Sequence, residues 1–165
     1  MAASAVGTRA PDFTLPTMDG KQFSLKEALA RGPVLAGFFK ISCPVCQFAF
    51  PFLERIYKAY GNRKVTMVGI SQNEKKDTAA FIKEYGVTFP VLLDDTNSYP
   101  ASNAYGLTNV PSLFWIAPDG QIEISSVGWI RKEIDEINQK AGKTSGEKPR
   151  IIFSPGENVP EFRAG

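Results

Sequence analysis

The chain has 165 residues, which suits a single domain that can bury a sizeable core. Its 43% hydrophobic and 22% charged residues are ordinary for a globular protein, and a net charge of +2 argues against a nucleic-acid binder or a polybasic membrane anchor. The longest apolar runs, such as Val34–Phe39, are too short to span a membrane.

The first part of the chain predicts a hairpin, a short helix and a buried strand. Residues 13–15 and 22–23 flank Asp19 and Gly20, a dipeptide typical of a tight β-turn. Residues 24–27 fit a capping box, which opens a short helix. The continuous apolar run 34–39 then predicts a central strand that is buried on both faces.

The following residues predict helices and strands in alternation. Apolar side chains at helical spacing precede Gly61 and Gly86, which are expected to close two helices. Asp119 and Gly120 mark a second hairpin turn. The expected elements are, in chain order, a helix over 44–60, a strand over 65–70, a helix over 75–85, a strand over 89–93, a helix over 98–105, strands over 113–117 and 122–127, and a helix over 129–141.

This order predicts an α/β fold with a central mixed β-sheet flanked by helices and an N-terminal hairpin extension. Residues 1–141 form the predicted domain. Residues 142–165 form a C-terminal tail, because glycines, prolines and charges there surround the apolar run 151–153. Such a run is too apolar to stay in water, so we expect residues 150–163 to fold back and bury Ile152 and Phe162.

The sequence contains two cysteines, Cys43 and Cys46, and no histidine. It therefore lacks the commonest general base and the ligands that would complete a structural zinc site. Pro44 is favoured at the first position of a helix, which places the Cys43 sulfur at a helix N-terminus, where free N–H groups stabilise a thiolate. We expect Cys43 to be the exposed attacking thiol and Cys46 the shielded resolving thiol.

Residues 38–46 resemble the active-site strand, Cys-x-x-Cys motif and following helix of thioredoxins, and residues 110–114 resemble the cis-proline loop of that fold. Residues 10–15 and 81–93 resemble the redoxin family, which includes peroxiredoxins of the alkyl hydroperoxide reductase and thiol-specific antioxidant type and the thiol–disulfide reductases of cytochrome maturation. The resemblance implies a thioredoxin fold and catalytic roles for Cys43 and Cys46. It also implies that Val110 and Pro111, joined by a cis bond, bind substrate.

Some positions depart from the family pattern. Ser42 stands where most of these oxidoreductases have tryptophan, and Gly37 stands where thioredoxin has a buried aspartate that helps to deprotonate the inner thiol. In the redoxin reductases a glutamate after the next strand serves that purpose, and Glu74 is the candidate here. Lys40 is a second candidate for thiolate tuning, because its positive charge follows the buried strand.

We expect the dithiol to exchange with protein or small-molecule disulfides, with a thiol reductant as the second partner and no cofactor or metal. The absence of the histidine that strongly oxidising members use favours a disulfide reductase. The sequence leaves the oligomeric state and the physiological partner open. Because the first residues contain neither a basic nor an apolar signal region, we expect a cytoplasmic protein, or a periplasmic one if a signal peptide has been removed.

Two other functions are weaker alternatives. In a peroxiredoxin-like thiol peroxidase Cys46 would be the peroxidatic sulfur, but Phe39 and Cys43 replace the proline and threonine of that motif, and no arginine accompanies Val110. A copper-carrying thiol module would hold Cu(I) on the two thiolates. The related copper chaperones, however, have a longer cysteine spacing and a histidine.

Overall fold

The computed structural model describes residues 3–60 and 64–165, and a five-stranded sheet lies at its centre. The strand order is β5-β4-β3-β6-β7. The central strand β3 is parallel to β4 on one side and antiparallel to β6 on the other, so the sheet is mixed as predicted. The strands are β3 (Val34–Phe39), β4 (Thr66–Ser71), β5 (Val91–Leu93), β6 (Ser112–Ile116) and β7 (Ile122–Val127).

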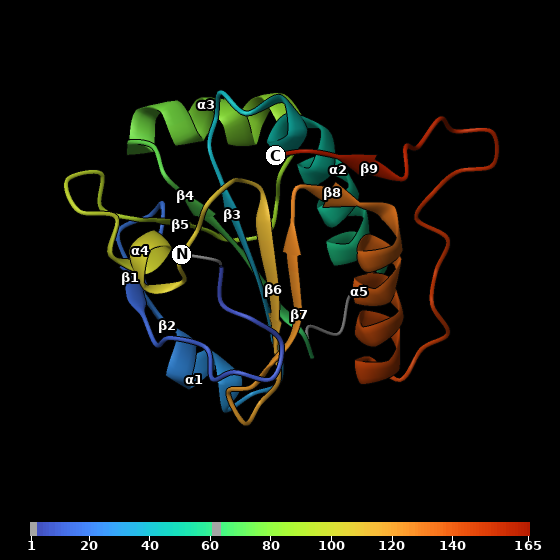
Figure 1. Cartoon of the computed structure of the whole chain (residues 1–165), viewed down its shortest axis with the longest axis horizontal. Coiled ribbons are helices and arrows are strands. Elements are labelled where there is room, and N and C mark those ends of the chain that lie inside the picture. The colour runs from blue at the N-terminus through green and yellow to red at the C-terminus, as the bar shows by residue number, and fades with distance from the viewer. Residues whose placement is uncertain (1–2, 61–63) are drawn as a thin grey trace.

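Helices cover both faces of this sheet (Figure 1). Neighbouring side chains of a strand point to opposite faces, and β3 accordingly feeds two buried cores. Leu35 and Phe39 lie in the core formed with α2, α3 and α5, whereas Ala36 and Phe38 lie in the core formed with α1 and α4. The helices are α1 (Leu25–Leu29), α2 (Pro44–Ala59), α3 (Lys75–Tyr85), α4 (Pro100–Ala104) and α5 (Arg131–Thr144).

An N-terminal hairpin precedes the sheet, as the sequence predicts. Its strands β1 (Thr14–Pro16) and β2 (Gln22–Ser24) pair antiparallel, and the Ser24 Oγ accepts a hydrogen bond from the Glu27 backbone N–H at 3.2 Å to cap α1. The predicted α/β architecture is therefore confirmed. The expected helix end at Gly61 lies outside the described residues. Within the described ranges, no helix combines the length and apolar character needed to cross a membrane.

The segment after α5 returns to the domain and adds a strand. β9 (Phe162–Arg163) pairs antiparallel with β8 (Trp129–Ile130). The prediction of a helix from residue 129 is therefore wrong at its start, because the backbone of Trp129 and Ile130 is extended to pair with the tail. Ile152 is buried as expected, but Phe162 is 61% exposed, because β9 belongs to a two-stranded ribbon outside the central sheet.

Polar contacts also attach the tail to the domain. The Arg55 guanidinium donates to the Ile152 carbonyl at 2.7 Å and to both carboxylate oxygens of Glu157 at 2.8 Å. The Trp129 Nε1 donates to the Pro160 carbonyl at 2.7 Å. The hydrogen bonds from Arg55 lower the pKa of Glu157 to about 2, so Glu157 stays ionised well into acid.

The variant Glu157→Gln should lower the melting temperature at neutral pH, because it removes the charge that pairs with Arg55. A lowered folded-state pKa adds stability above the ordinary value of 4.5, and that stability is lost as the pH falls toward 2. The difference in melting temperature from the parent protein should therefore narrow between pH 4.5 and 3 in thermal unfolding followed by circular dichroism. The control Glu161→Gln, which removes an exposed partner of Arg131, should have a smaller effect. A constant difference across this pH range would contradict the prediction.

Candidate functional site

Cys43 lies at the junction between the central strand and the longest helix described. β3 ends at Phe39, α2 begins at Pro44, and Cys43 is the N-cap residue with an extended backbone. Its Sγ accepts a hydrogen bond from the Cys46 backbone N–H at 3.2 Å. The sulfur thus takes the place that a serine or aspartate oxygen takes at other helix N-termini, as the sequence predicts.

The loop before Cys43 is held from two sides. The Ile41 backbone N–H donates to the Asn73 Oδ1 at 2.9 Å, and the Ile41 carbonyl accepts from the Gln47 Nε2 at 2.9 Å. The Cys43 N–H donates to the Lys40 carbonyl at 3.2 Å. Asn73 follows β4 and Ile41 follows β3, so their hydrogen bond joins the carboxyl ends of these two parallel strands beside Cys43. Open α/β sheets place their binding sites at this edge of the sheet.

The Val110–Pro111 peptide bond is cis, and the loop that contains it lies against Cys43. The Cys43 Sγ donates to the Val110 carbonyl at 3.4 Å. Cys43 and Val110 line one open cavity of about 370 Å³, together with Lys40, Ser42, Pro44, Gln72, Leu107, Thr108, Asn109 and Gly165. The side chain of Cys43 is half-buried rather than exposed as predicted, because the loop and Gly165 lie around it.

Cys46 is fully buried one turn into α2, and both cysteines are free thiols. Burial, and secondarily the hydrogen bond with Cys43, raises the pKa of the Cys46 thiol well above its usual range. Gly37 has no side chain that could act as a base for Cys46. A Cβ at that position would lie 3.1 Å from the Leu113 side chain and would also touch Phe50 and Leu53. A carboxylate at position 37 would lie among apolar side chains, and the Leu113 side chain would have to shift to admit it.

Of the two candidates for thiolate tuning, Lys40 lines the cavity that contains Cys43 and Glu74 does not. Lys40 is exposed and lines the Cys43 cavity, so its tuning role stays a prediction. The structure does not bring Glu74 to the cysteines. Its carboxylate accepts a hydrogen bond from the Thr96 hydroxyl and lines a separate hollow of about 450 Å³ with Lys75 and Asp95.

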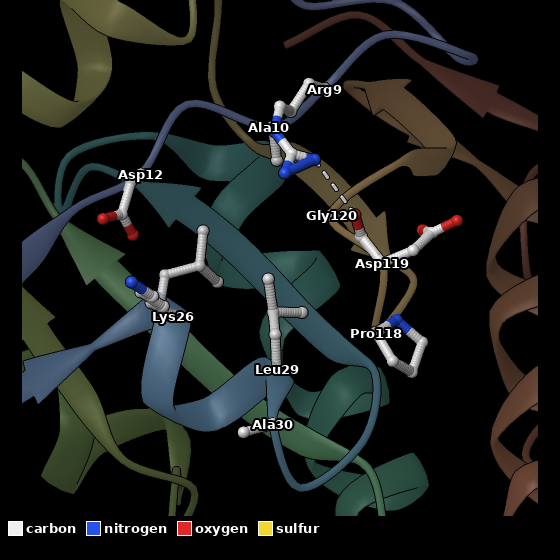
Figure 2. A pocket seen from close by; sticks show the side chains of 10 residues that line it. Arg9, Ala10, Asp12, Lys26, Leu29, Ala30, Pro118, Asp119 and Gly120 are labelled. Carbon is white, nitrogen blue, oxygen red and sulfur yellow. Dashed lines mark hydrogen bonds between the residues drawn. The ribbon is translucent and has the colours of Figure 1, made fainter.

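A further hollow, of about 480 Å³, lies between α1 and the turn that follows β6 (Figure 2). Leu29 and Ala10 form part of its apolar wall, and the Arg9 Nη1 donates to the Asp119 carbonyl at 3.1 Å across its rim. Neither cysteine lines this hollow. In the described part of the chain, no three His, Cys, Asp or Glu side chains come together that could hold a metal ion.

Sequence reasoning missed several residues that shape the site. Asn73 and Gln47 fix the loop. The position of Asn73 shortly after β4 was the available signal for it, whereas Gln47 lies within α2. Asn109 precedes the predicted cis-proline loop, and its Nδ2 donates to the Gly165 carbonyl at 3.1 Å. No local signal places Gly165 at the thiol, because it arrives there through the pairing of distant strands.

The chain is similar to a known protein family, to characterised relatives and to solved structures. The profile of the AhpC/TSA family matches residues 6–125. The chain is 32% identical to the thiol-disulfide oxidoreductase ResA of Bacillus subtilis (strain 168) over 144 residues, which cover 85% of this chain and 79% of the relative. A thioredoxin-family thiol:disulfide interchange protein from Chlorobium tepidum TLS has a TM-score of 0.68 at 30% identity, covering 84% of this chain and 99% of that structure.

A thiol:disulfide interchange protein from Bacteroides sp. has a TM-score of 0.72 at 21% identity, over 84% of this chain and 91% of its own. This second structure supports the fold alone. Taken with the mixed sheet and the N-terminal hairpin, these likenesses confirm the predicted thioredoxin-like fold.

The burial of Cys46 predicts that its attack on a mixed disulfide at Cys43 accelerates with pH. The raised pKa leaves Cys46 protonated at neutral pH, so its thiolate fraction rises about tenfold per pH unit. With an aromatic thiol attached to Cys43, release of that thiol should follow this slope between pH 7 and 9 in stopped-flow absorbance. Cys46→Ser should release none. A rate that does not change with pH would show that another group deprotonates Cys46.

Proposed function

The chain belongs to the AhpC/TSA family and is a thiol–disulfide oxidoreductase, and we propose that it acts as a disulfide reductase through Cys43 and Cys46. Cys43 is the attacking thiol and Cys46 the resolving thiol. The substrates are protein or small-molecule disulfides, and a thiol reductant restores the dithiol.

One observation carries the division of roles. The Cys43 sulfur is half-buried at the mouth of a cavity, whereas Cys46 is fully buried behind it. A substrate disulfide reaches Cys43 first, and only the Cys43 sulfur then lies within reach of Cys46. The Cys46 N–H donates to the Cys43 Sγ at 3.2 Å, which holds the attacking sulfur at the start of α2.

The reaction proceeds in two exchanges. The Cys43 thiolate attacks one sulfur of the substrate disulfide, the substrate S–S bond breaks, and the departing thiolate takes up a proton. The Cys46 thiol then loses its proton to solvent and attacks the Cys43 Sγ, which forms the Cys43–Cys46 disulfide and releases the second substrate thiolate. The substrate gains two electrons and two protons, and the dithiol is oxidised.

Val110 supports the binding of an extended substrate. Its backbone lies beside Cys43, and its carbonyl is 3.4 Å from the Cys43 sulfur. A substrate segment that pairs with this backbone would gain main-chain hydrogen bonds without dependence on its side chains. The peroxidase alternative finds less support, because no arginine is among the described residues that line the cavity.

The substitutions Cys43→Ser and Cys46→Ser should separate the two roles. Cys43→Ser should abolish thiol-dependent reduction of insulin, because no attacking sulfur is left. Cys46→Ser should instead accumulate mixed disulfides on Cys43, which mass spectrometry detects. Full activity of Cys43→Ser would contradict the assigned roles, as would the absence of any adduct on Cys46→Ser.

The direction of exchange predicts the reduction potential of the Cys43–Cys46 couple. A reductase should have a potential near that of thioredoxin, roughly −270 mV, whereas an oxidant should lie near −120 mV. Equilibration with glutathione redox buffers, followed by alkylation of the free thiols, measures it. A value close to the oxidant's would overturn the proposed direction and leave the exchange chemistry intact.

A further inference from the structure

The C-terminal tail reaches the backbone of the cis-proline loop. Gly165 lines the cavity that contains Cys43, and its carbonyl accepts a hydrogen bond from the Asn109 Nδ2 at 3.1 Å. A Cβ on Gly165 would lie 2.3 Å from the Val110 carbonyl oxygen and 3.3 Å from the Gly128 Cα. Gly165 therefore packs directly on the Val110 carbonyl, with Gly128 on its other side.

Several contacts lead the tail to this position. β9 pairs with β8 up to Arg163, whose guanidinium lies 5.0 Å from the centre of the Phe48 ring. Gly128 has a positive φ of 77°, and a Cβ there would lie 2.6 Å from the Arg163 carbonyl oxygen. Its N–H donates to the Pro111 carbonyl at 2.8 Å. Glycines at 128 and 165 thus let the tail lie against the loop. Figure 1 shows the C-terminus close to the start of β6, the strand that follows this loop.

An extended substrate and the end of the tail require the same space. A peptide that pairs with the Val110 backbone has to approach the carbonyl that Gly165 covers. A compact disulfide needs only Cys43, which the cavity leaves open between Lys40, Ser42 and Gln72. Gly165 therefore blocks an extended peptide from the Val110 backbone but does not block a compact disulfide from Cys43.

We propose that Ala164 and Gly165 are a specificity-determining segment, which competes with extended polypeptides for the Val110 backbone and leaves compact disulfides unaffected. This inference rests on the proposed function. When only a fraction of the molecules have the loop uncovered, the apparent affinity for a peptide falls by that fraction, whereas the chemical step is unchanged. The segment should therefore raise KM for polypeptide disulfides and leave kcat alone.

The test compares the parent protein with a variant that lacks residues 164–165. The deletion keeps both residue pairs of β8 with β9 and so preserves the fold of the tail. For insulin, we expect KM to fall several-fold with kcat unchanged; for hydroxyethyl disulfide, both constants should stay the same. Gly165→Ala keeps the chain length and should shift KM in the same direction, because its Cβ collides with the Val110 carbonyl. The control Ile151→Ala, at an exposed tail position, should change neither substrate.

A second measurement does not depend on disulfide chemistry. Alkylation of Cys43 by a polyethylene-glycol maleimide should accelerate on deletion, whereas alkylation by iodoacetamide should not. Unchanged insulin KM and maleimide rates in the deletion variant would overturn this inference and leave the proposed function standing. Failure of both the parent and the deletion variant to reduce either disulfide would instead overturn the proposed function, and the inference with it.

Discussion

The hydrogen bond from the Cys46 N–H to the Cys43 Sγ exists because Cys43 is the N-cap residue of α2. That junction is fixed in turn by β3, whose six residues are all buried and which bonds to a neighbouring strand on each side. Alternate residues of β3 enter two separate cores, so neither face of the strand is free to shift. The tight packing of the sheet on both faces therefore holds the Cys43 sulfur in position.

Sequence reasoning succeeded where structure depends on neighbouring residues. The apolar run of β3, Pro44 at the helix start and the Ser24 cap are local signals, and each element formed as expected. It failed where the outcome depends on distant partners. Trp129 and Ile130 continue a helical pattern, yet they form a strand because β9 offers backbone partners that no local pattern reveals. The exposure of Phe162 has the same origin.

The candidate site shows the same division. The two cysteines and the cis Val110–Pro111 bond lie where the sequence placed them, because motif spacing and family resemblance both describe short segments. Glu74 was placed by its position after a strand, but the direction of a carboxylate depends on available donors, and Thr96 supplies one away from the thiols. The surroundings of Gly37 could not be inferred either, since Leu113, Phe50 and Leu53 come from two other elements.

The pairing of β8 with β9 also bears on how the molecule folds. It joins segments separated by the whole of α5, so the chain must lose loop-closure entropy before these contacts form. Between the two strands, Ile152 and Val159 are buried in the same core as Ile134 of α5, so the tail completes that core as well as the ribbon. Until it docks, β8 presents an unpaired edge, and the indole N–H of Trp129 lacks the Pro160 carbonyl. The tail thus closes an edge that would otherwise invite association between partly folded copies.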